Sequence, residues 1–192
     1  KFPQIVTYCA SLHIDLSQDL IPVIPSAHFV CGGINVDFQG RTNVLNLFAC
    51  GECSNTGLHG ANRLASNSLI EALVFAHNIS EEICKNSEFV RPIAIQQNNV
   101  QLAKVDENWI AQSKLELQKV MHQKVFILKY YDELLSALEW IIQLKKSIDR
   151  KQTEGKMSAS LVELKNMVTI AYLIVKQSIE RTENVGTFHK IV

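Results

Sequence analysis

The sequence predicts an α/β part followed by an all-α part, and two observations support this division. Six of the eight glycines lie between Gly32 and Gly60, which concentrates turns and close backbone contacts in the first half. After a polar segment at 86–100, apolar residues recur at spacings of three and four, the pattern of helices that pack along one face. We therefore expect short strands and loops before residue 86 and helices after residue 100.

A short helix, an extended connection and several strands are expected first. Residues 2–14 have apolar residues at helical spacing, which predicts a helix. Residues 20–25 contain two prolines, and proline disfavours helical backbone in the residue before it. Short strands are expected at 28–31, 33–37 and 45–50. The last has the apolar run of a buried strand: Leu45, Leu47, Phe48 and Ala49.

A longer helix is expected from about Ser68 to Lys85, after a loop over 51–67. Ser68 and Glu71 have the S-x-x-E spacing of a capping box, in which the two side chains satisfy free backbone N–H groups at a helix start. Four apolar residues share one face of this helix: Leu69, Leu73, Ala76 and Ile83.

Three further helical stretches are expected after a linker, at 101–128, 130–151 and 157–184. The second has an apolar stripe of Leu134, Leu138, Ile141 and Ile148. The third alternates by four and three, and we expect its stripe to face inward: Met157, Leu161, Leu164, Val168, Ala171 and Val175. Gly155 supplies a helix stop between these two stretches. Connections this short favour antiparallel neighbours, so we expect an up-down three-helix bundle.

Composition excludes several classes of function. The 19 basic residues are balanced by 19 acidic ones, so the charge balance indicates neither nucleic acid nor an anionic membrane as a partner. No apolar run approaches the roughly 20 residues that span a bilayer. The five cysteines form no repeating framework, which favours a reducing compartment. We expect a cytoplasmic protein.

The segment from His59 to Glu71 carries the strongest signal of a binding site. It places two imidazole nitrogens and the guanidinium of Arg63 just before the expected helix start at Ser68. The N-terminus of a helix presents free N–H groups and positive dipole character, which favour an anion or an electron-rich ring. An arginine can grip a carboxylate with two parallel hydrogen bonds. The segment therefore predicts a site for an anionic substrate beside a cofactor.

The C-x-x-C at Cys50 and Cys53 permits a redox or zinc interpretation. Zinc would need a second pair of Cys or His residues at suitable spacing, and the sequence shows none. We interpret the two cysteines as incidental small buried residues, and no metal site is predicted.

Four motifs resemble those of the L-aspartate oxidases and, more broadly, of the flavoproteins that include succinate dehydrogenase and fumarate reductase. They are A-H-F-V-C-G-G at 27–33, G-R-T-N-V at 40–44, L-F-A-C-G-E at 47–52 and G-L-H-G-A-N-R-L-A-S-N-S-L at 57–69. Their order and spacing together are far more specific than any one of them. The resemblance extends from about Phe2 to about Glu183, and the helical second half favours the oxidase.

The resemblance implies a fold and a division into domains. Residues 28–86 would be the C-terminal part of an FAD-binding Rossmann-like domain, and residues 1–27 the end of the capping, substrate-binding domain. Residues 87–100 would be a linker, and residues 101–192 the helical bundle domain.

The resemblance also implies roles for individual residues. His28 and Arg63 would contact the dicarboxylate substrate, and Glu52 would bind the ribityl chain of FAD. The backbone at Ser68 and Leu69 would approach the pyrimidine side of the flavin ring, where a helix N-terminus stabilises the negative charge of the reduced flavin. Without the motifs, Glu52 would read as an exposed loop acid and His28 as a structural histidine. The family's catalytic arginine would lie upstream of residue 1, so no catalytic residue is assigned here.

The implied activity is the oxidation of L-aspartate to iminoaspartate in de novo NAD (quinolinate) biosynthesis. FAD would accept the hydride, oxygen or fumarate would re-oxidise the flavin, and quinolinate synthase would consume the unstable imine. One alternative is the flavoprotein subunit of a fumarate reductase or succinate dehydrogenase. A second alternative is a non-catalytic fragment whose helices form an interaction module.

Two features depart from the family pattern. The chain begins at Lys1 and contains no G-x-G-x-x-G motif, which a flavoprotein of this family needs for the pyrophosphate of FAD. We therefore expect a C-terminal fragment that is inactive alone. Relatives carry R-G-L-H-F after the last helix, whereas this chain has V-G-T-F-H at 185–189. The resemblance therefore assigns this tail no role in closing the site.

Overall fold

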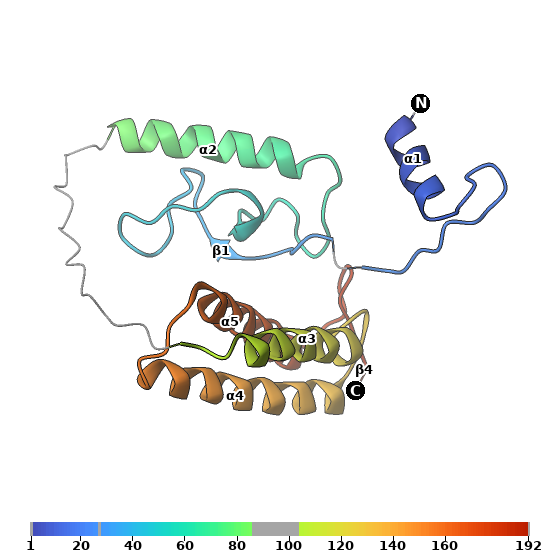
Figure 1. Ribbon diagram of the computed structural model, residues 1–192. Coiled ribbons are helices and arrows are strands. Elements are labelled where there is room, and N and C mark those ends of the chain that lie inside the picture. Colours follow the sequence, from blue (N-terminus) through green and yellow to red (C-terminus); the bar gives the residue numbers. More distant parts are fainter. Residues whose placement is uncertain (1, 27, 86–103, 192) are drawn as a thin grey trace.

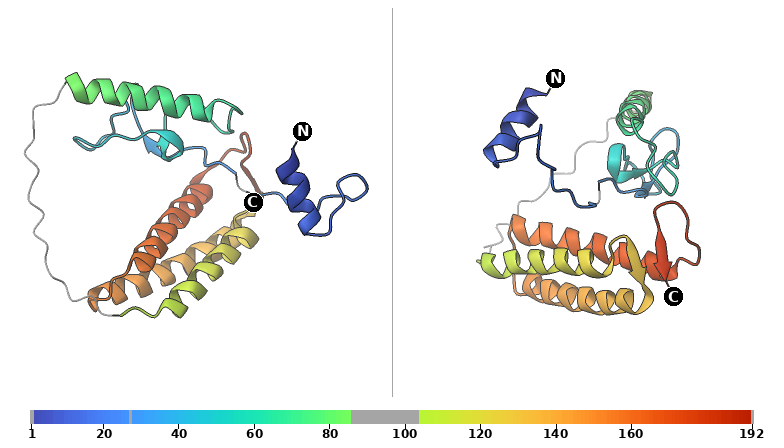
Figure 2. Two further views of the ribbon diagram at one scale, coloured as in Figure 1. Left: turned by 45° about the horizontal axis from the view of Figure 1, so that its top comes forward. Right: turned by 90° about the vertical axis from the view of Figure 1, so that its right-hand side faces the viewer.

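The computed structural model describes residues 2–26, 28–85 and 104–191. In Figure 1, helix α2 (Ser68–Lys85) lies above a layer of loops with two very short strands, and helices α3 (Glu107–Lys124), α4 (Tyr131–Thr153) and α5 (Ala159–Glu180) pack together below. Helix α1 (Pro3–Ser11) stands to one side in all three ribbon views (Figure 2). The predicted linker at 87–100 lies outside the described residues.

The strands of the first part are shorter than the sequence predicts. Strand β1 (Ile34–Asn35) pairs in parallel with β2 (Ser54–Asn55), which follows the single-turn helix η1 (Gly51–Cys53). The side chain of Asn55 donates a 2.7 Å hydrogen bond to the side-chain oxygen of Asn35, which joins the two strands a second time. The strand expected at 33–37 is thus reduced to two residues, and the one expected at 28–31 is not formed.

The prediction of a buried strand at 45–50 is wrong. Leu45 is 89% exposed, and Asn46 adopts a left-handed backbone with φ of 63°. The Leu47 N–H closes a turn onto the Val44 carbonyl at 3.1 Å, and an isolated antiparallel bridge joins Arg41 to Phe48. Asparagine tolerates the left-handed region, so the apolar run bends into a turn instead of extending.

Helix α2 has the predicted bounds. The face that packs against the loops contains Glu71. Glu71 is 7% exposed, whereas the expected apolar stripe is on the outer face, with Leu69 71% and Leu73 64% exposed. The contact with the loops is close: a Cβ at Gly40 would lie 2.4 Å from Cγ1 of Ile79. The left-handed backbone of Gly40, with φ of 74°, and this close approach both favour glycine at this point.

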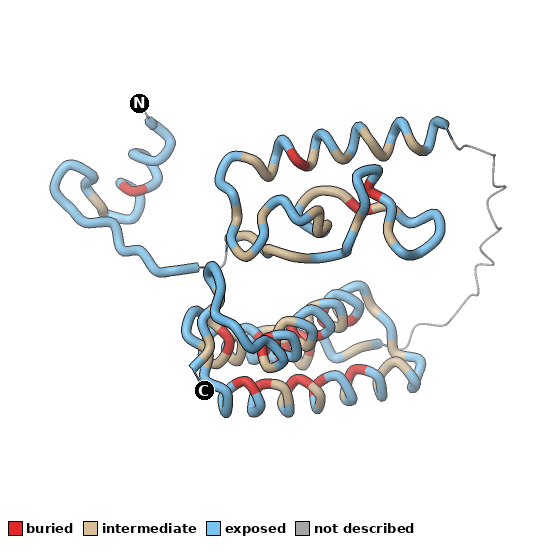
Figure 3. The backbone as a smooth tube through the Cα atoms, turned by 180° about the vertical axis from the view of Figure 1, so that it is seen from behind, coloured by how far each residue is buried: buried red, intermediate tan, exposed pale blue. Residues whose placement is uncertain are grey.

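Helices α3, α4 and α5 surround one apolar core, and their buried residues face one another in Figure 3. Side-chain caps begin two of them: Asp106 accepts from the N–H of Trp109, and Ser158 from that of Leu161, both at 3.1 Å. Helix α4 ends as predicted at Gly155, whose φ of 75° allows the left-handed backbone of a helix stop. None of the described helices is long and apolar enough to cross a membrane.

The predicted stripes form most of this core. Its buried members are Ile110, Leu117, Val125, Leu134, Ala137, Ile141, Leu144, Ile148, Leu161, Leu164, Val168, Ala171 and Val175. Leu138 is partly buried against it. Met157 is the exception to the predicted inward stripe, at 39% exposed, because α5 begins after its cap at Ser158.

The second half also contains a parallel pair of strands that the sequence did not predict. Strand β3 (Leu128–Tyr130) pairs with β4 (His189–Ile191), in the register Leu128 with His189. The ladder fixes the residues that follow α5 onto the helices. Between α5 and β4 the chain rises toward the loop before α2, and the two are joined by hydrogen bonds from Thr187 to Ala61 (Figure 1).

Candidate functional site

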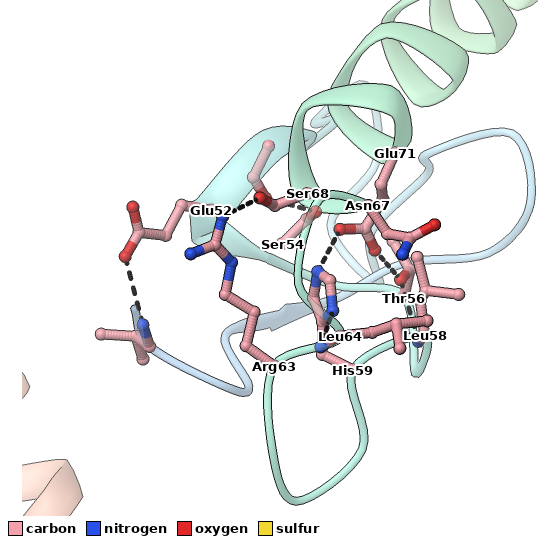
Figure 4. A network of polar contacts seen from close by, with 12 residues as sticks. Glu52, Ser54, Thr56, Leu58, His59, Arg63, Leu64, Asn67, Ser68 and Glu71 are labelled. Atoms are coloured by element: carbon pink, nitrogen blue, oxygen red, sulfur yellow. Dashed lines mark hydrogen bonds and ion pairs between the residues drawn. The ribbon is translucent and has the colours of Figure 1, made fainter. Parts of the chain in front are cut away.

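Arg63 is held at the start of α2 with part of its guanidinium unpaired. Its Nη2 donates a 2.7 Å hydrogen bond to Oγ of Ser68 (Figure 4), and its Cζ lies 5.0 Å from the centre of the Phe29 ring. Nε is buried and has no hydrogen-bond partner among the described residues. A buried donor without a partner costs free energy, so this guanidinium is poised to bind an acceptor.

His59 and Glu71 fasten the loop before α2 to the helix. His59 Nε2 lies 2.9 Å from a carboxylate oxygen of Glu71, and Thr56 donates its hydroxyl to the other oxygen (Figure 4). His59 Nδ1 accepts from the N–H of Leu64 at 3.1 Å. Because Nδ1 accepts, the ring proton is on Nε2, which is buried 2.9 Å from Glu71 but makes no aligned hydrogen bond within the described residues. The capping box is therefore not formed: Glu71 holds the loop instead of the helix start.

The first turn of α2 presents free backbone donors. Its first intrahelical bond runs from the N–H of Glu71 to the carbonyl of Asn67, at 2.8 Å. The N–H groups of Ser68, Leu69 and Ile70 come before that bond, where a helix has no internal acceptors. Leu69 is 71% exposed, so this turn is open to a ligand. The helix dipole adds positive character there.

Glu52 lies in η1 and faces outward. One of its carboxylate oxygens accepts from the N–H of Val30 at 3.1 Å, the one hydrogen bond the structure gives it within the described residues (Figure 4). The turn at Gly33, with φ of 135°, packs on η1 so closely that a Cβ there would lie 2.4 Å from the carbonyl oxygen of Cys53. These contacts place the exposed Glu52 side chain, and its second oxygen is open to a hydroxyl donor.

His28 and Arg63, to which the resemblance assigns one substrate, line the same cavity. The cavity has a volume of about 910 Å³, and Phe29 also lines it, with its ring edge-on to His59 at 5.1 Å. His28 itself is exposed. Glu52, Ser68 and Leu69 are not among the lining residues, but Ser68 contacts Arg63 directly through its hydroxyl, so the two predicted groups of ligands meet at the start of α2.

The far wall of this cavity comes from the helical part, which the sequence analysis did not assign to the site. It includes His122 of α3, Ile174 of α5, Thr187 and Lys129 of β3. Burial lowers the pKa of Lys129, whose ammonium donates to the carbonyl of Phe126 at 2.7 Å. The only sequence signal for this wall is the apolar run at 125–128, because its residues meet the first part only through the fold.

The cysteines form no redox or metal arrangement in the described part of the chain. Cys53 is exposed, which corrects the expectation of a buried residue, and its thiol donates to the carbonyl of Cys50 at 3.3 Å. No group of three or more His, Cys, Asp or Glu side chains among the described residues could hold a metal ion.

Comparison with known proteins defines the class to which this site belongs. Residues 1–69 match a family model described as an FAD binding domain, and residues 114–191 match one described as the fumarate reductase flavoprotein C-terminus. Quinol fumarate reductase of E. coli has the same fold, with a TM-score of 0.71 and 23% identity over 100% of this chain and 36% of its own. The Sdh1 complex of Mycobacterium smegmatis in the apo form has a TM-score of 0.72 and 25% identity over 98% of this chain and 35% of its own. The chain belongs to the succinate dehydrogenase and fumarate reductase flavoprotein family.

Within that family, the chain is similar over nearly its whole length to proteins named L-aspartate oxidase. The protein of Acinetobacter baylyi is 37% identical over 99% of this chain and 36% of its own length, and that of Yersinia pestis has the same values. The chloroplastic protein of Arabidopsis thaliana is 35% identical over 96% of this chain and 31% of its own length. The chain thus spans about a third of the length of these curated relatives.

Proposed function

We propose that this chain is the C-terminal part of an FAD-dependent L-aspartate oxidase. Residues 1–27 are the end of its capping domain, residues 28–86 the C-terminal part of its FAD-binding Rossmann-like domain, and residues 101–192 a three-helix bundle domain after a linker at 87–100. The similarity to L-aspartate oxidases over 99% of the chain supports this assignment.

The main support for an anionic substrate is the environment of the Arg63 guanidinium. Its guanidinium is fixed by Ser68 and by Phe29, and its Nε is buried without a partner among the described residues. A carboxylate fits this cation best, because its two oxygens match the planar fork of the guanidinium. His28 lines the same cavity and can donate to a second carboxylate, which suits a dicarboxylate substrate.

The residues present fit FAD at two points. The exposed carboxylate of Glu52 has an oxygen free to accept from a hydroxyl of the ribityl chain. The free N–H groups at Ser68 and Leu69 suit the pyrimidine edge of the flavin ring, where the reduced flavin is negative. When bound, FAD supplies a hydride acceptor for the Cα–H of the substrate, and the oxidation yields iminoaspartate.

The part of this chain in that reaction is binding and orientation. Arg63 and His28 hold the carboxylates and thereby fix the direction in which Cα points, and the α2 terminus stabilises developing negative charge. We assign no catalytic residue to the chain, because the family's catalytic arginine lies outside it. Oxygen or fumarate serves as the final acceptor, quinolinate synthase takes the product in quinolinate formation, and the protein is cytoplasmic.

A fumarate reductase or succinate dehydrogenase flavoprotein is the second candidate, and the shared fold with quinol fumarate reductase favours it. The two candidates differ in substrate, so the full-length protein is assayed for oxidation of L-aspartate and of succinate with the same electron acceptor. We expect turnover of L-aspartate and little of succinate. Oxidation of succinate without that of L-aspartate would reverse the assignment. If neither is oxidised by FAD-loaded protein, a non-catalytic interaction module becomes the better interpretation.

A further inference from the structure

The segment between α5 and the end of β4, residues 182–191, is a closed loop fixed to the helical part, and we call it the C-terminal loop. Its β4 strand pairs with β3. Asn184 and Lys190 close the loop by two hydrogen bonds, from the Lys190 N–H to the Asn184 side chain at 2.8 Å and from that side chain to the Lys190 carbonyl at 3.0 Å. The Lys190 ammonium also donates to the carbonyl of Ile179, near the end of α5, at 2.8 Å.

The tip of the C-terminal loop contacts the loop that carries Arg63. The N–H and the hydroxyl of Thr187 both donate to the carbonyl of Ala61 at 3.3 Å, across 126 residues of sequence. Gly186 has a φ of +63°, and a Cβ there would lie 2.4 Å from the Ala61 oxygen and 2.7 Å from its Cβ. Contacts below 3.0 Å with backbone cannot be relieved by a side-chain rotation, so the approach requires glycine.

The position of Ala61 is linked to that of Arg63 by the hydrogen bonds of the same loop. The N–H of Asn62 donates to the carbonyl of His59, and the N–H of Leu64 donates to its ring, both at 3.1 Å. Arg63 lies between these two bonds. A shift of the backbone at Ala61 therefore displaces the guanidinium from the geometry set by Ser68.

We propose that Gly186 and Thr187 are positioning residues for Arg63, so that the helical part of the chain orients the carboxylate-binding group of the substrate site. The proposal rests on the proposed function in that Arg63 binds a substrate carboxylate. A planar guanidinium discriminates by direction as well as by charge, and a displacement of about 1 Å can cost on the order of 100-fold in rate. The divergent tail sequence V-G-T-F-H thus has a role in the site.

The first test measures the coupling between the C-terminal loop and the loop that carries Arg63, and it needs no enzyme assay. Hydrogen exchange of residues 57–67 is compared in the 192-residue chain and in its Gly186→Ala variant. Gly155→Ala is the matched control, because Gly155 has a similar φ of +75° but open space where a Cβ would be placed. We expect Gly186→Ala to speed the exchange of the amides of Asn62 and Leu64 about 10-fold or more, and Gly155→Ala to leave it unchanged.

The second test measures the consequence in the full-length enzyme. Gly186→Ala should raise the KM for L-aspartate and lower kcat/KM by about 10- to 100-fold. Its effect should be far smaller in an Arg63→Lys background, because residues that act through one another are not additive. Thr187→Val should show a weaker form of the same change. Thr187→Ser, which keeps the hydroxyl, should restore the wild-type KM.

The outcomes separate this proposal from the proposed function. Faster exchange at 57–67 in Gly186→Ala, or in Thr187→Val if the first variant does not fold, supports the coupling even if the wild type does not oxidise L-aspartate. Exchange that matches the Gly155→Ala control overturns it. Kinetic effects of Gly186→Ala and Arg63→Lys that simply add would also overturn it, since the tail would then act independently of Arg63.

Discussion

His59 Nε2 and a carboxylate oxygen of Glu71 lie 2.9 Å apart, with the two side chains only 9% and 5% exposed. The pair joins the middle of the loop that carries Arg63 to the first turn of α2. The same helix start holds the guanidinium through Ser68. The candidate substrate cation and the candidate flavin contact are thereby set by one short helix terminus and one loop.

Removal of this pair should loosen the loop more than it loosens the rest of the chain. Glu71→Ala leaves the Thr56 hydroxyl without its acceptor and removes the carboxylate that lies 2.9 Å from His59 Nε2, and a buried donor left unpaired costs about 1–3 kcal/mol. Glu81→Ala on the same helix is the control, because its exposed pairs with His77 and Lys85 should contribute at most about 1 kcal/mol. Native-state hydrogen exchange of α2 in the 192-residue chain gives both values. Equal effects of the two changes would show that the pair does not secure the loop.

The helices could be predicted from the sequence, because their signals are local. Ser68 to Lys85 was predicted to the residue, and Gly155 ends α4 as its backbone freedom indicates. The prediction for α3 extended too far in both directions, since Asp106 caps its start and Val125 its end. The apolar stripe of Leu69 and Leu73 faces outward, which apolar periodicity alone did not predict. An apolar face can be recognised in a sequence, but what it packs against cannot.

The strands were predicted poorly because each depends on a partner far along the chain. The apolar run at Leu45 resembles a strand, yet Asn46 turns it, and β3 pairs with a strand about 60 residues later. The candidate site has the same limit. Arg63 and Ser68 are near one another in sequence, so their proximity could be predicted, whereas the wall around His122 and Lys129 comes from tertiary packing.

Arg63→Lys should impair the full-length enzyme on L-aspartate. Lysine keeps the positive charge, but it cannot make two parallel hydrogen bonds and cannot bond Ser68 and a carboxylate in the same plane. We expect a higher KM, a lower kcat and a loss of about 2–4 kcal/mol in kcat/KM, the range for a buried charge pair that loses its geometry. Arg41→Lys is the control, since Arg41 pairs with Glu82 away from the cavity. Unchanged kinetics in Arg63→Lys would make Arg63 a structural residue.

The 192-residue chain alone should retain little FAD. The proposed function gives it contacts to the ribityl chain and the flavin ring through Glu52 and the α2 terminus, but its sequence contains no G-x-G-x-x-G loop for the pyrophosphate. The chain is incubated with excess FAD and desalted, and its flavin absorbance is compared with that of the full-length protein. Stoichiometric retention by the chain would show that the binding determinants lie within these residues.

The helical part should fold without the rest of the chain, because its core is closed by its own three helices. Residues 104–191 include that core and the β3·β4 ladder that fixes the C-terminal loop. Leu164 is fully buried, so Leu164→Ala should lower the free energy of unfolding by about 2–5 kcal/mol. Leu173 lies on the same helix at 47% exposed, and Leu173→Ala should change it by no more than about 0.5 kcal/mol. Thermal unfolding of the 104–191 segment followed by circular dichroism gives both values. A non-cooperative transition, or equal effects of the two leucine changes, would mean that these helices need the first part of the chain in order to pack.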